Sequence, residues 1–580
     1  MKGAAGLLRA REYTDGRRFV KLVPLPMSPG SPGPLGSPSR PAPAPTGYLA
    51  LVLHAHLPFV RHPEHARHLE ERWLYEAIVE CYLPLLDAFD RLAEDGVPFA
   101  LTMSVTPPLA AMLKDPLLQE RFEAYLDRAE ALAEQEQRRL WGDAGLAPVA
   151  TFYKEHFTRM RAVWERCGGD IVAGLVQHWD AGRIELLTCS ATHCYLPGLL
   201  AAPEGIRPQL ELGMRGFERI VGRRPTGAWL AECAYDPSYD DAIARAGIRY
   251  TVLDTHGVTH ARPRPLLGAH APITSPAGVT FFARDVDSSK QVWSRDEGYP
   301  GDAYYREFHR DIGFDLPETQ LMGQVAADGS RLMTGLKYFR ITGKDAEKRP
   351  YQPGVARERA VAHAGDFVLR RAKQVGQLAS TLASGAAPPI VVAPYDAELY
   401  GHWWFEGPWF LEAVFRALPQ TRGAVESITL GKFLERHPIC VQATPSASTW
   451  GAGGYGEVWV GPEAAPTWRH VHHATRYTAW LVDRHRQADG RRGQALDQAI
   501  RELLLLQASD WAFILKHGTA TGYAQARIRS HVHRLRHLGH LVEAEHIDER
   551  DAAWLDDLCL RDNFFAQLSG HELRAPFVHP

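Results

Sequence analysis

Short, almost continuous runs of hydrophobic residues recur along the chain, and stretches with helical periodicity separate them. The hydrophobic runs occupy 48–53, 99–104, 184–189, 227–231, 250–253 and 389–393. The helical stretches occupy 70–93, 116–139, 151–164, 208–221 and 238–246. Such runs are typical of strands buried on both faces of a parallel sheet. Their alternation with helices predicts an α/β protein built from parallel βα units.

The polar residues that follow these runs favour a barrel over an open sheet. Predicted strands end at or near His54, His56, His193, Glu232, Asp254 and Asp396. In a β/α barrel such residues converge at the carboxyl ends of the strands, where the active site lies. A doubly wound sheet normally has a glycine-rich loop after its first strand, and here that place reads His-Ala-His-Leu-Pro. We therefore predict a β/α barrel over 47–405, with a long inserted segment at 255–388.

Both ends of the chain differ from this pattern. Beyond about residue 405 the strand signals fade, and amphipathic helices are predicted over 468–487, 491–517 and 522–546. We interpret 406–580 as an α-helical C-terminal domain that contributes to the active site. Residues 24–45 contain nine prolines among Gly, Ser and Ala. Because such a composition cannot bury a core, 1–46 is predicted to be a disordered extension.

Composition excludes several classes of protein. The 65 Lys and Arg residues against 68 Asp and Glu give a formal charge of −3, which argues against a nucleic-acid-binding protein. No hydrophobic run reaches the roughly 18 residues that span a bilayer, so no membrane association is expected. The seven cysteines are scattered and form no CxxC pair. They predict neither a disulfide framework nor a zinc ribbon, and they fit a reducing cytoplasm best.

Two carboxylates at predicted strand ends carry the main chemical hypothesis. Glu232 lies in Trp229-Leu-Ala-Glu-Cys-Ala-Tyr235, and Asp396 precedes an aromatic stretch that contains Trp403 and Trp404. Cleavage of a glycosidic bond needs one carboxyl beside the anomeric carbon and another that protonates the leaving oxygen. Aromatic neighbours can desolvate a carboxyl and raise its pKa toward neutrality. Either residue alone is more often an ordinary ion-pair partner, but the two together indicate a glycosidase-like site.

Tryptophans near these carboxylates support a sugar ligand. Indole rings stack on the C–H faces of sugars, and their N–H groups reach hydroxyls. Trp404 and Trp409 follow Asp396, whereas Trp450 and Trp459 lie in a glycine-rich stretch. Core packing is the usual role of a lone tryptophan. The four glycines between 451 and 456 favour a loop around Trp450 instead.

Two further features admit other interpretations. His54 and His56 share one face of a strand, as in zinc-dependent barrel hydrolases and deacetylases, where His193, Asp254 and His256 would complete the ligand set. A His-x-His pair is weak evidence for a metal, and no HExxH-type pair supports it. Asp510 lies inside an apolar helix predicted over 501–516. A buried aspartate there needs a partner, which can be a helix cap, an ion pair or a sugar.

Several long motifs together resemble one known family. The segments 54–58, 229–234 and 395–404 are similar to signature regions of glycoside hydrolase family 57, and 291–294, 298–302, 335–343 and 508–511 resemble its 1,4-α-glucan branching enzymes. The resemblance spans about 47–580. It implies a retaining mechanism on an incomplete, seven-stranded β/α barrel followed by a helical domain. It also implies an α-1,4-glucan as substrate, which suits the near-neutral charge, and no metal or organic cofactor.

The resemblance assigns roles to individual residues. Glu232 matches the nucleophile and Asp396 the general acid/base, which in a retaining enzyme lie about 5–5.5 Å apart. Residues expected to bind substrate are His54, His56, His193, Arg310, Gly335, Trp404, Trp450, Trp459 and Asp510. The loop around Trp450 and the segment 284–300 are candidate lids.

Three alternatives to a branching enzyme stay open. A 4-α-glucanotransferase or an α-amylase of the same family would use the same two carboxylates and differ in the acceptor. A metal-dependent hydrolase or deacetylase would use His54, His56 and Asp254. A glucan-binding protein without activity would keep the tryptophans and tolerate loss of Glu232. The sequence gives no indication of the oligomeric state.

Overall fold

A computed structural model describes residues 44–294, 297–326, 329–343, 347–382 and 386–578. The disordered extension predicted for 1–46 lies almost wholly outside these residues. The strands are β1 (Gly47–Ala55), β2 (Leu101–Val105), β3 (Ile184–Cys189), β4 (Ala228–Trp229), β5 (Tyr250–Leu253), β6 (Ile273–Thr274), β7 (Thr280–Ala283), β8 (Ile390–Asp396), β9 (Val425–Ser427) and β10 (Val441–Gln442).

The helices of the barrel region and its insertion are α1 (Glu71–Ala77), the π-helix η1 (Ile78–Tyr82), α2 (Leu83–Glu94), α3 (Pro107–Leu113), α4 (Pro116–Arg139), α5 (Ala147–Arg166), α6 (Ile171–Asp180), α7 (Ile206–Val221), α8 (Asp240–Arg245), α9 (Thr255–Thr259), α10 (Val286–Trp293), α11 (Ile312–Asp315) and α12 (Pro353–Ala379). Those that follow are α13 (Gly407–Ala417), α14 (Leu430–Arg436), α15 (Glu457–Val460), α16 (Ala465–His485), α17 (Gly490–Leu506), α18 (Ser509–His517), α19 (Thr521–Glu543), α20 (Glu549–Arg561) and α21 (Gly570–Arg574).

Seven parallel strands form an incomplete barrel. Five of them pair in the order β4-β3-β2-β1-β8, and β5 pairs with β7. A bridge between Arg284 and Val392, with Asp285 N–H donating to the Val392 carbonyl at 2.8 Å, joins the end of β7 to β8. Between β4 and β5 the described residues form no ladder, and the ring stays open there. The predicted seven-stranded incomplete β/α barrel is therefore confirmed.

Alternation along the strands separates an inner core from an outer one. Tyr48, Ala50 and Val52 of β1 point into the barrel, where they meet Trp229 and Tyr250. The intervening leucines of β1 point outward and pack against the surrounding helices. At the amino end, β9 pairs with the start of β1, and the side chains of α14 fill the barrel. Because side chains fill the amino end of the barrel, a site is expected at the carboxyl ends of the strands.

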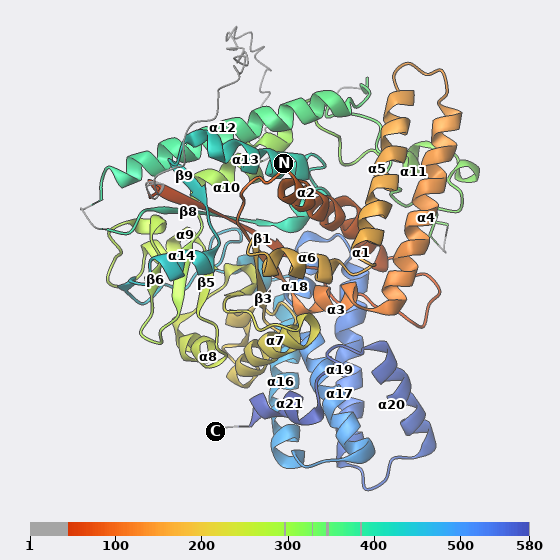
Figure 1. Ribbon diagram of the computed structural model, residues 1–580. Helices are drawn as coiled ribbons and strands as arrows, with labels where there is room; N and C mark the ends of the chain where they lie inside the picture. Colours follow the sequence, from red (N-terminus) through yellow and green to blue (C-terminus); the bar gives the residue numbers. More distant parts are fainter. Residues whose placement is uncertain (1–43, 295–296, 327–328, 344–346, 383–385, 579–580) are drawn as a thin grey trace, which may run out of the picture. The chain divides into compact units, whose positions relative to one another are not determined.

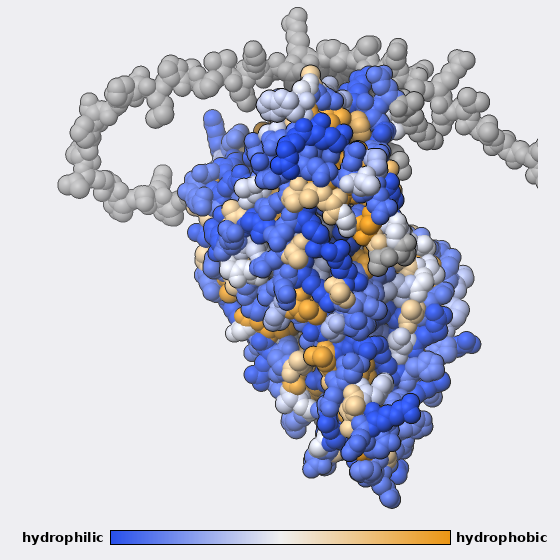
Figure 2. Space-filling model, turned by 90° about the vertical axis from the view of Figure 1, so that its right-hand side faces the viewer, coloured by the Kyte–Doolittle hydropathy of each residue, from blue (hydrophilic) through white to orange (hydrophobic). Residues whose placement is uncertain are grey.

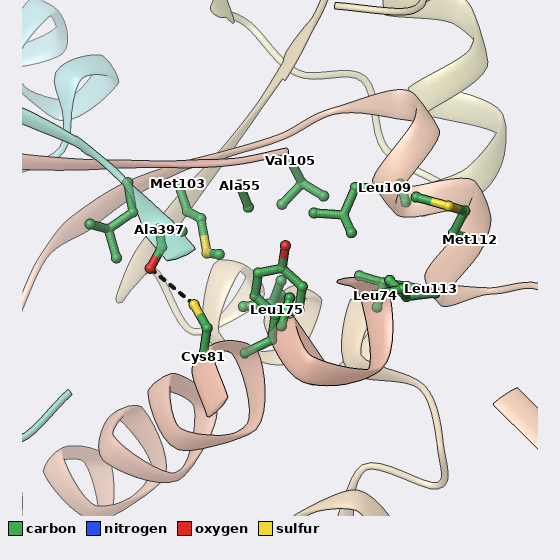
Figure 3. Packing of buried hydrophobic residues seen from close by; sticks show 14 of the residues in the cluster. Ala55, Leu74, Cys81, Met103, Val105, Leu109, Met112, Leu113, Leu175 and Ala397 are labelled. Atoms are coloured by element: carbon green, nitrogen blue, oxygen red, sulfur yellow. Dashed lines mark hydrogen bonds between the residues drawn. The ribbon is translucent and has the colours of Figure 1, made fainter. Parts of the chain in front are cut away.

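Helices hold the carboxyl ends of β1 and β2 in place. Figure 3 shows Met103 and Val105 of β2 facing the buried side chains of neighbouring helices, among them Leu109 of α3. In the same view the Cys81 thiol, on the π-helix η1, donates to the Ala397 carbonyl at 3.0 Å. This contact ties the segment directly after β8 to the helix that follows β1.

The region around and after residue 405 differs from the predicted organisation in two respects. β9 pairs with β1, and α13 packs on α12, so the predicted boundary at 405 divides elements that belong to one packed unit. The helix predicted over 491–517 is two helices, α17 and α18, because Ala508 forms a bridge with Cys194 instead of continuing the helix. Helices α16, α17 and α19 pack against one another, as Figure 1 shows.

Within the described residues no helix is both long and apolar enough to cross a membrane. On the face shown in Figure 2, hydrophobic residues form small, separated patches among polar ones. Large connected hydrophobic surfaces are what membrane or stable partner contacts require.

Candidate active site

Two histidines lie at the carboxyl end of β1. The alternation that points the side chains of β1 inward continues to His54, whose ring stacks on Trp229 with 4.9 Å between centroids and 18° between planes. Its Nδ1 lies 3.2 Å from Oγ of Ser104 on β2. His56 follows two residues later, and its Nδ1 lies 3.0 Å from the Thr106 hydroxyl. Residues on β2, β4 and the segment after β2 thus fix both imidazoles.

His193 joins these two rings from the segment after β3. Its backbone is in the left-handed region, with φ of 54°. Its ring stacks on that of His56 with 3.8 Å between centroids, and its Nε2 lies 2.9 Å from Nε2 of His54. The three histidines that the sequence interpretation assigned to one subsite therefore lie in contact.

Asp396 and Glu398 come from the end of β8. Asp396 pairs in register with His54, which places its carboxyl at the same barrel mouth. Glu398 accepts hydrogen bonds from the His56 backbone N–H at 3.1 Å and the Tyr82 hydroxyl at 2.5 Å. Among the described residues no donor bonds the Asp396 carboxyl. Glu398 is thus held by the protein, whereas Asp396 is available to a ligand.

Glu232 follows β4 with a strained backbone. Its φ of 64° and ψ of 21° lie in the left-handed region, which costs about 1–3 kcal/mol for a residue other than glycine. The Glu232 carbonyl accepts from the Trp450 backbone N–H at 3.0 Å and the Thr449 hydroxyl at 2.8 Å. The Trp450 indole N–H donates to Glu232 Oε2 at 2.8 Å. The glycine-rich loop is therefore anchored on the residue that it covers.

Helix α18 brings its first two residues into the site. Ser509 Oγ lies 2.8 Å from His193 Nδ1 and 3.5 Å from Glu232 Oε1. Asp510 accepts from His56 Nε2 at 3.0 Å. The break between α17 and α18 sets both residues at a helix start, not inside the continuous helix that the sequence pattern predicted. Residues from the C-terminal helical region thus complete the polar shell around Glu232.

Burial dominates the electrostatics of the carboxyls. Removal from water raises the pKa of Glu232 to about 8, of Asp396 to about 7 and of Glu398 to about 8. Besides burial, which is the largest cause, the Asp396 charge contributes to the raised pKa of both glutamates. The hydrogen bond from Trp450 acts in the opposite direction on Glu232. Glu232 and Asp396 therefore both have a pKa near neutrality, and the charge of Asp396 acts on Glu232.

Several residues of the site were not assigned to it from the sequence, namely Ser104, Thr106, Arg284, Glu398 and Ser509. Arg284 lies 2.9 Å from Asp254 and over the Trp450 ring at 5.9 Å. With His56, its charge opposes the effect of burial on the pKa of Asp396. Its position directly after the strand 280–283 is the signal that could have identified it.

The five residues of the metal-site hypothesis do not form one ligand cluster in the structure. That hypothesis combined His54, His56, His193, Asp254 and His256. Asp254 is paired with Arg284 at 2.9 Å and lies 3.4 Å from His256 Nδ1, while His256 Nε2 bonds the Gly454 carbonyl at 2.8 Å. The side chains whose ligand atoms lie within 4.8 Å of one another are His56, His193 and Asp510. Asp510 is bonded to His56 in this cluster, with 3.0 Å between the carboxylate oxygen and Nε2.

Two predicted sugar-binding tryptophans lie in the core. Trp404 is 2% exposed and packs against Tyr305 and Phe410. Trp459 is also 2% exposed, and its ring stacks on Tyr195 with 5.2 Å between centroids. Neither indole offers a free face to a ligand, because other side chains cover it. In this structure both indoles are part of the packed interior, and their expected contact with a sugar stays a prediction.

Arg310 and Gly335 lie in the inserted segment. The Arg310 guanidinium is 3.0 Å from Asp315 and over the Phe339 ring at 4.5 Å. Gly335 has φ of 87°, and its N–H donates to Asp311 Oδ2 at 2.9 Å. These contacts join the two residues to their own segment. The structure does not bring them into contact with Glu232 or Asp396 within its described residues.

Comparisons with known proteins agree with this geometry. The family model described as glycosyl hydrolase family 57 matches residues 50–353. The model described as the C-terminal region of 1,4-alpha-glucan branching enzyme matches residues 470–571. A 1,4-alpha-glucan branching enzyme of Thermococcus kodakarensis is 34% identical over 555 residues, which are 90% of this chain and 77% of that one.

Two solved structures are similar over almost their whole length. The alpha-amylase AmyC of Thermotoga maritima is 36% identical with a TM-score of 0.84, covering 91% of this chain and 99% of that one. A branching enzyme of Pyrococcus horikoshii is 32% identical with a TM-score of 0.80, covering 92% and 97%. The extent of these matches, together with the family model and the barrel, shows that the chain belongs to glycosyl hydrolase family 57.

Proposed function

We propose that the protein is a 1,4-α-glucan branching enzyme, which cleaves an α-1,4 linkage and transfers the chain to a sugar 6-hydroxyl. The observation that carries this proposal is the origin of Ser509 and Asp510. Both reach Glu232 or His56 from α18, inside the segment that matches the branching-enzyme C-terminal model. The relatives from Thermococcus and Pyrococcus that cover most of the chain carry the same name.

Hydrogen bonding suggests the division of roles between the two carboxyls. Glu232 has two donors, Trp450 Nε1 and Ser509 Oγ, and donors stabilise the ionised form. Asp396 has no such donor among the described residues, so no hydrogen bond holds it as a carboxylate, although burial raises the pKa of both groups, to about 8 for Glu232 and about 7 for Asp396. We therefore assign the negative charge to Glu232, as nucleophile, and the proton to Asp396, as general acid.

The reaction then proceeds in two balanced steps. A Glu232 oxygen attacks the anomeric carbon, the glycosidic C–O bond breaks, and Asp396 gives its proton to the departing chain. In the second step a 6-hydroxyl oxygen attacks the same carbon, the ester bond to Glu232 breaks, and Asp396 takes the hydroxyl proton. Two inversions leave the α configuration unchanged. The product is an α-1,6 branch on a glycogen-type glucan.

Transfer requires that water be kept from the glucosyl-enzyme. The Trp450 loop covers Glu232, because Thr449 and Trp450 both bond its carbonyl. The His256 ring also bonds this loop, at the Gly454 carbonyl. We assign to this loop, and to the described residues 284–294 and 297–300 of the predicted lid segment, the exclusion of water while an acceptor chain binds; residues 295–296 of that prediction lie outside the described residues.

Incubation with amylose tests the proposal. Many new α-1,6 linkages with few new reducing ends are expected, measured by debranching with isoamylase and by a reducing-end assay on the same sample. Reducing ends without branches would instead identify an amylase, which the similarity to AmyC makes the second candidate. Disproportionation into longer and shorter linear chains would identify a 4-α-glucanotransferase.

The pH dependence follows from the coupled carboxyls. Activity requires one proton on the pair of Glu232 and Asp396, and their raised pKa values lie at about 7 and about 8. Below about pH 7 the pair gains a second proton and loses its nucleophile. Above about pH 8 it loses the acid. We expect a bell-shaped profile of kcat/KM with its maximum between these values, measured from the loss of amylose–iodine absorbance. A flat profile from pH 5 to 9 would contradict the assignment.

Trp450→Phe is expected to lower kcat about tenfold or more, because it keeps an aromatic ring but removes the N–H that stabilises the Glu232 carboxylate. The acidic limb of the profile should move to higher pH, since loss of this donor raises the pKa of Glu232. The matched control is Trp164→Phe, which removes an indole donor from Glu123 at 3.0 Å on the outer helices. Equal effects of the two substitutions on kcat would show that the indole acts through stability alone.

A further inference from the structure

A continuous hydrogen-bonded chain crosses the site and ends at Glu232. Ser104 Oγ lies 3.2 Å from His54 Nδ1, and His54 Nε2 lies 2.9 Å from His193 Nε2. His193 Nδ1 lies 2.8 Å from Ser509 Oγ, which lies 3.5 Å from Glu232 Oε1. The chain thus joins the ends of β1 and β2 to the start of α18.

The neutral state of the two histidines lets the direction of every proton be worked out. Both rings are almost fully buried, and burial holds the pKa of His54 and His193 well below the usual value. Each therefore carries one N–H. An ionised Glu232 can only accept, so the Ser509 hydroxyl must donate to it.

The rest of the chain follows from that donation. Ser509 Oγ must accept from His193 Nδ1–H, which leaves His193 Nε2 without a proton. His54 then donates from Nε2, and its bare Nδ1 accepts from Ser104. Ser104 Oγ also lies 3.4 Å from the Thr188 carbonyl, but its shorter contact, at 3.2 Å, is with His54. With Glu232 ionised, as the proposed mechanism requires, one arrangement of protons therefore satisfies every link.

We propose that Ser509 is a positioning residue for the nucleophile. Its hydroxyl fixes the tautomers of His193 and His54 and holds Glu232 as a carboxylate aimed at the anomeric carbon. The inference rests on the proposed role of Glu232 and extends it to the C-terminal helical region. Without the Ser509 hydroxyl, no hydrogen bond in this chain would determine which ring nitrogen of His193 and of His54 carries the proton.

The backbone around Ser509 supports a positioning role. The Ser509 N–H donates to the His193 carbonyl at 3.0 Å, and Ala508 bridges Cys194. Ser509 is 3% exposed, so water does not replace its hydroxyl without rearrangement. Two backbone contacts thus dock α18 on the segment that carries His193, independently of the side-chain chain itself.

The groups that face Glu232 from the packed elements define the pH test. They are Asp396 on β8, Asp510 on α18, Cys189 on β3, and His193 and Tyr195 after β3. Removal of the Ser509 hydroxyl leaves all of them in place. It removes a donor to the carboxylate, so the pKa of Glu232 should rise and the acidic limb should move to higher pH.

The test compares Ser509→Ala with Ser509→Thr in the full chain, by the pH profile of kcat/KM on amylose. We expect Ser509→Ala to lose about tenfold to a hundredfold in kcat, with the acidic limb displaced upward. Ser509→Thr, which keeps a hydroxyl, should restore most of the rate and the original limb. Ser275→Ala removes an equally buried hydroxyl from the turn between β6 and β7 and is the matched control.

Two results would overturn the inference. One is wild-type kcat and an unchanged profile in Ser509→Ala. The other is a loss of rate with an unmoved acidic limb and a lowered Tm, which would mark a structural role. If Glu232→Gln stays active, it is the proposed role of Glu232 that fails. Iodine absorbance reports cleavage with or without branching, so the choice between transfer and hydrolysis does not affect this test.

Discussion

Replacement of Glu232 by Ala is expected to lower kcat on amylose by about four orders of magnitude. In the proposed mechanism this carboxylate forms the covalent intermediate, and the neighbouring carboxyls of Glu398 and Asp396 have other roles. Glu398 is bonded to the His56 backbone and to Tyr82, and Asp396 is needed as acid. Initial rates of iodine-absorbance loss, with enzyme concentration raised for the variant, measure the effect.

Azide provides the sharper test of Glu232. The cavity left by the side chain admits a small anion beside the anomeric carbon, so azide should restore cleavage and give a β-glucosyl azide. Nuclear magnetic resonance of the product reads its configuration. An α product, or a variant that keeps a tenth of the original rate, would remove Glu232 from the role of nucleophile. Glu185→Gln, which changes a buried carboxyl bonded to Tyr250 inside the barrel, is the control for lost stability.

Replacement of Asp396 by Ala is expected to lower kcat on amylose by about three orders of magnitude, because an alkoxide leaving group then departs without a proton. An α-maltooligosyl fluoride needs no such proton, so its first step should survive. The second step lacks the base that activates a 6-hydroxyl. The glucosyl-enzyme should therefore accumulate.

Mass spectrometry of the intact protein measures this accumulation. Asp396→Ala should release fluoride in a burst equal to the enzyme concentration and gain the mass of one transferred chain. Glu232→Ala should show neither. An adduct on Glu232→Ala would mean that another residue is the nucleophile. The absence of an adduct on Asp396→Ala would contradict the role of Asp396 in the second step. The alkaline limb of the pH profile should also disappear in Asp396→Ala, since this limb reports loss of the acid proton.

The sequence predicted the elements that local patterns specify. Alternating positions in β1 place His54 on the inner face, and the same rule places Asp396 beside it on β8. Both follow from the period of a strand and from the convergence of strand ends in a barrel. The same patterns could not identify the break before Ser509, because a bridge to Cys194 causes it.

Side-chain environments were harder to predict than positions. Trp404 lies in an aromatic stretch after Asp396, and Trp450 lies in a glycine-rich stretch. The first is buried by Tyr305 and Phe410, whereas the second bonds Glu232. The difference depends on elements far away in the chain. Arg284 was overlooked for the same reason, since its partner Asp254 ends a different strand.

By itself the sequence determined the barrel class, the carboxylates at two strand ends, the histidines beside them and the family. Each of these is encoded within one element or its immediate continuation. Only the tertiary structure decided how the carboxyls titrate and which residues orient them. Those properties depend on desolvation and on hydrogen bonds between residues such as Glu232 and Ser509, which lie 277 positions apart. Folding alone brings such groups together.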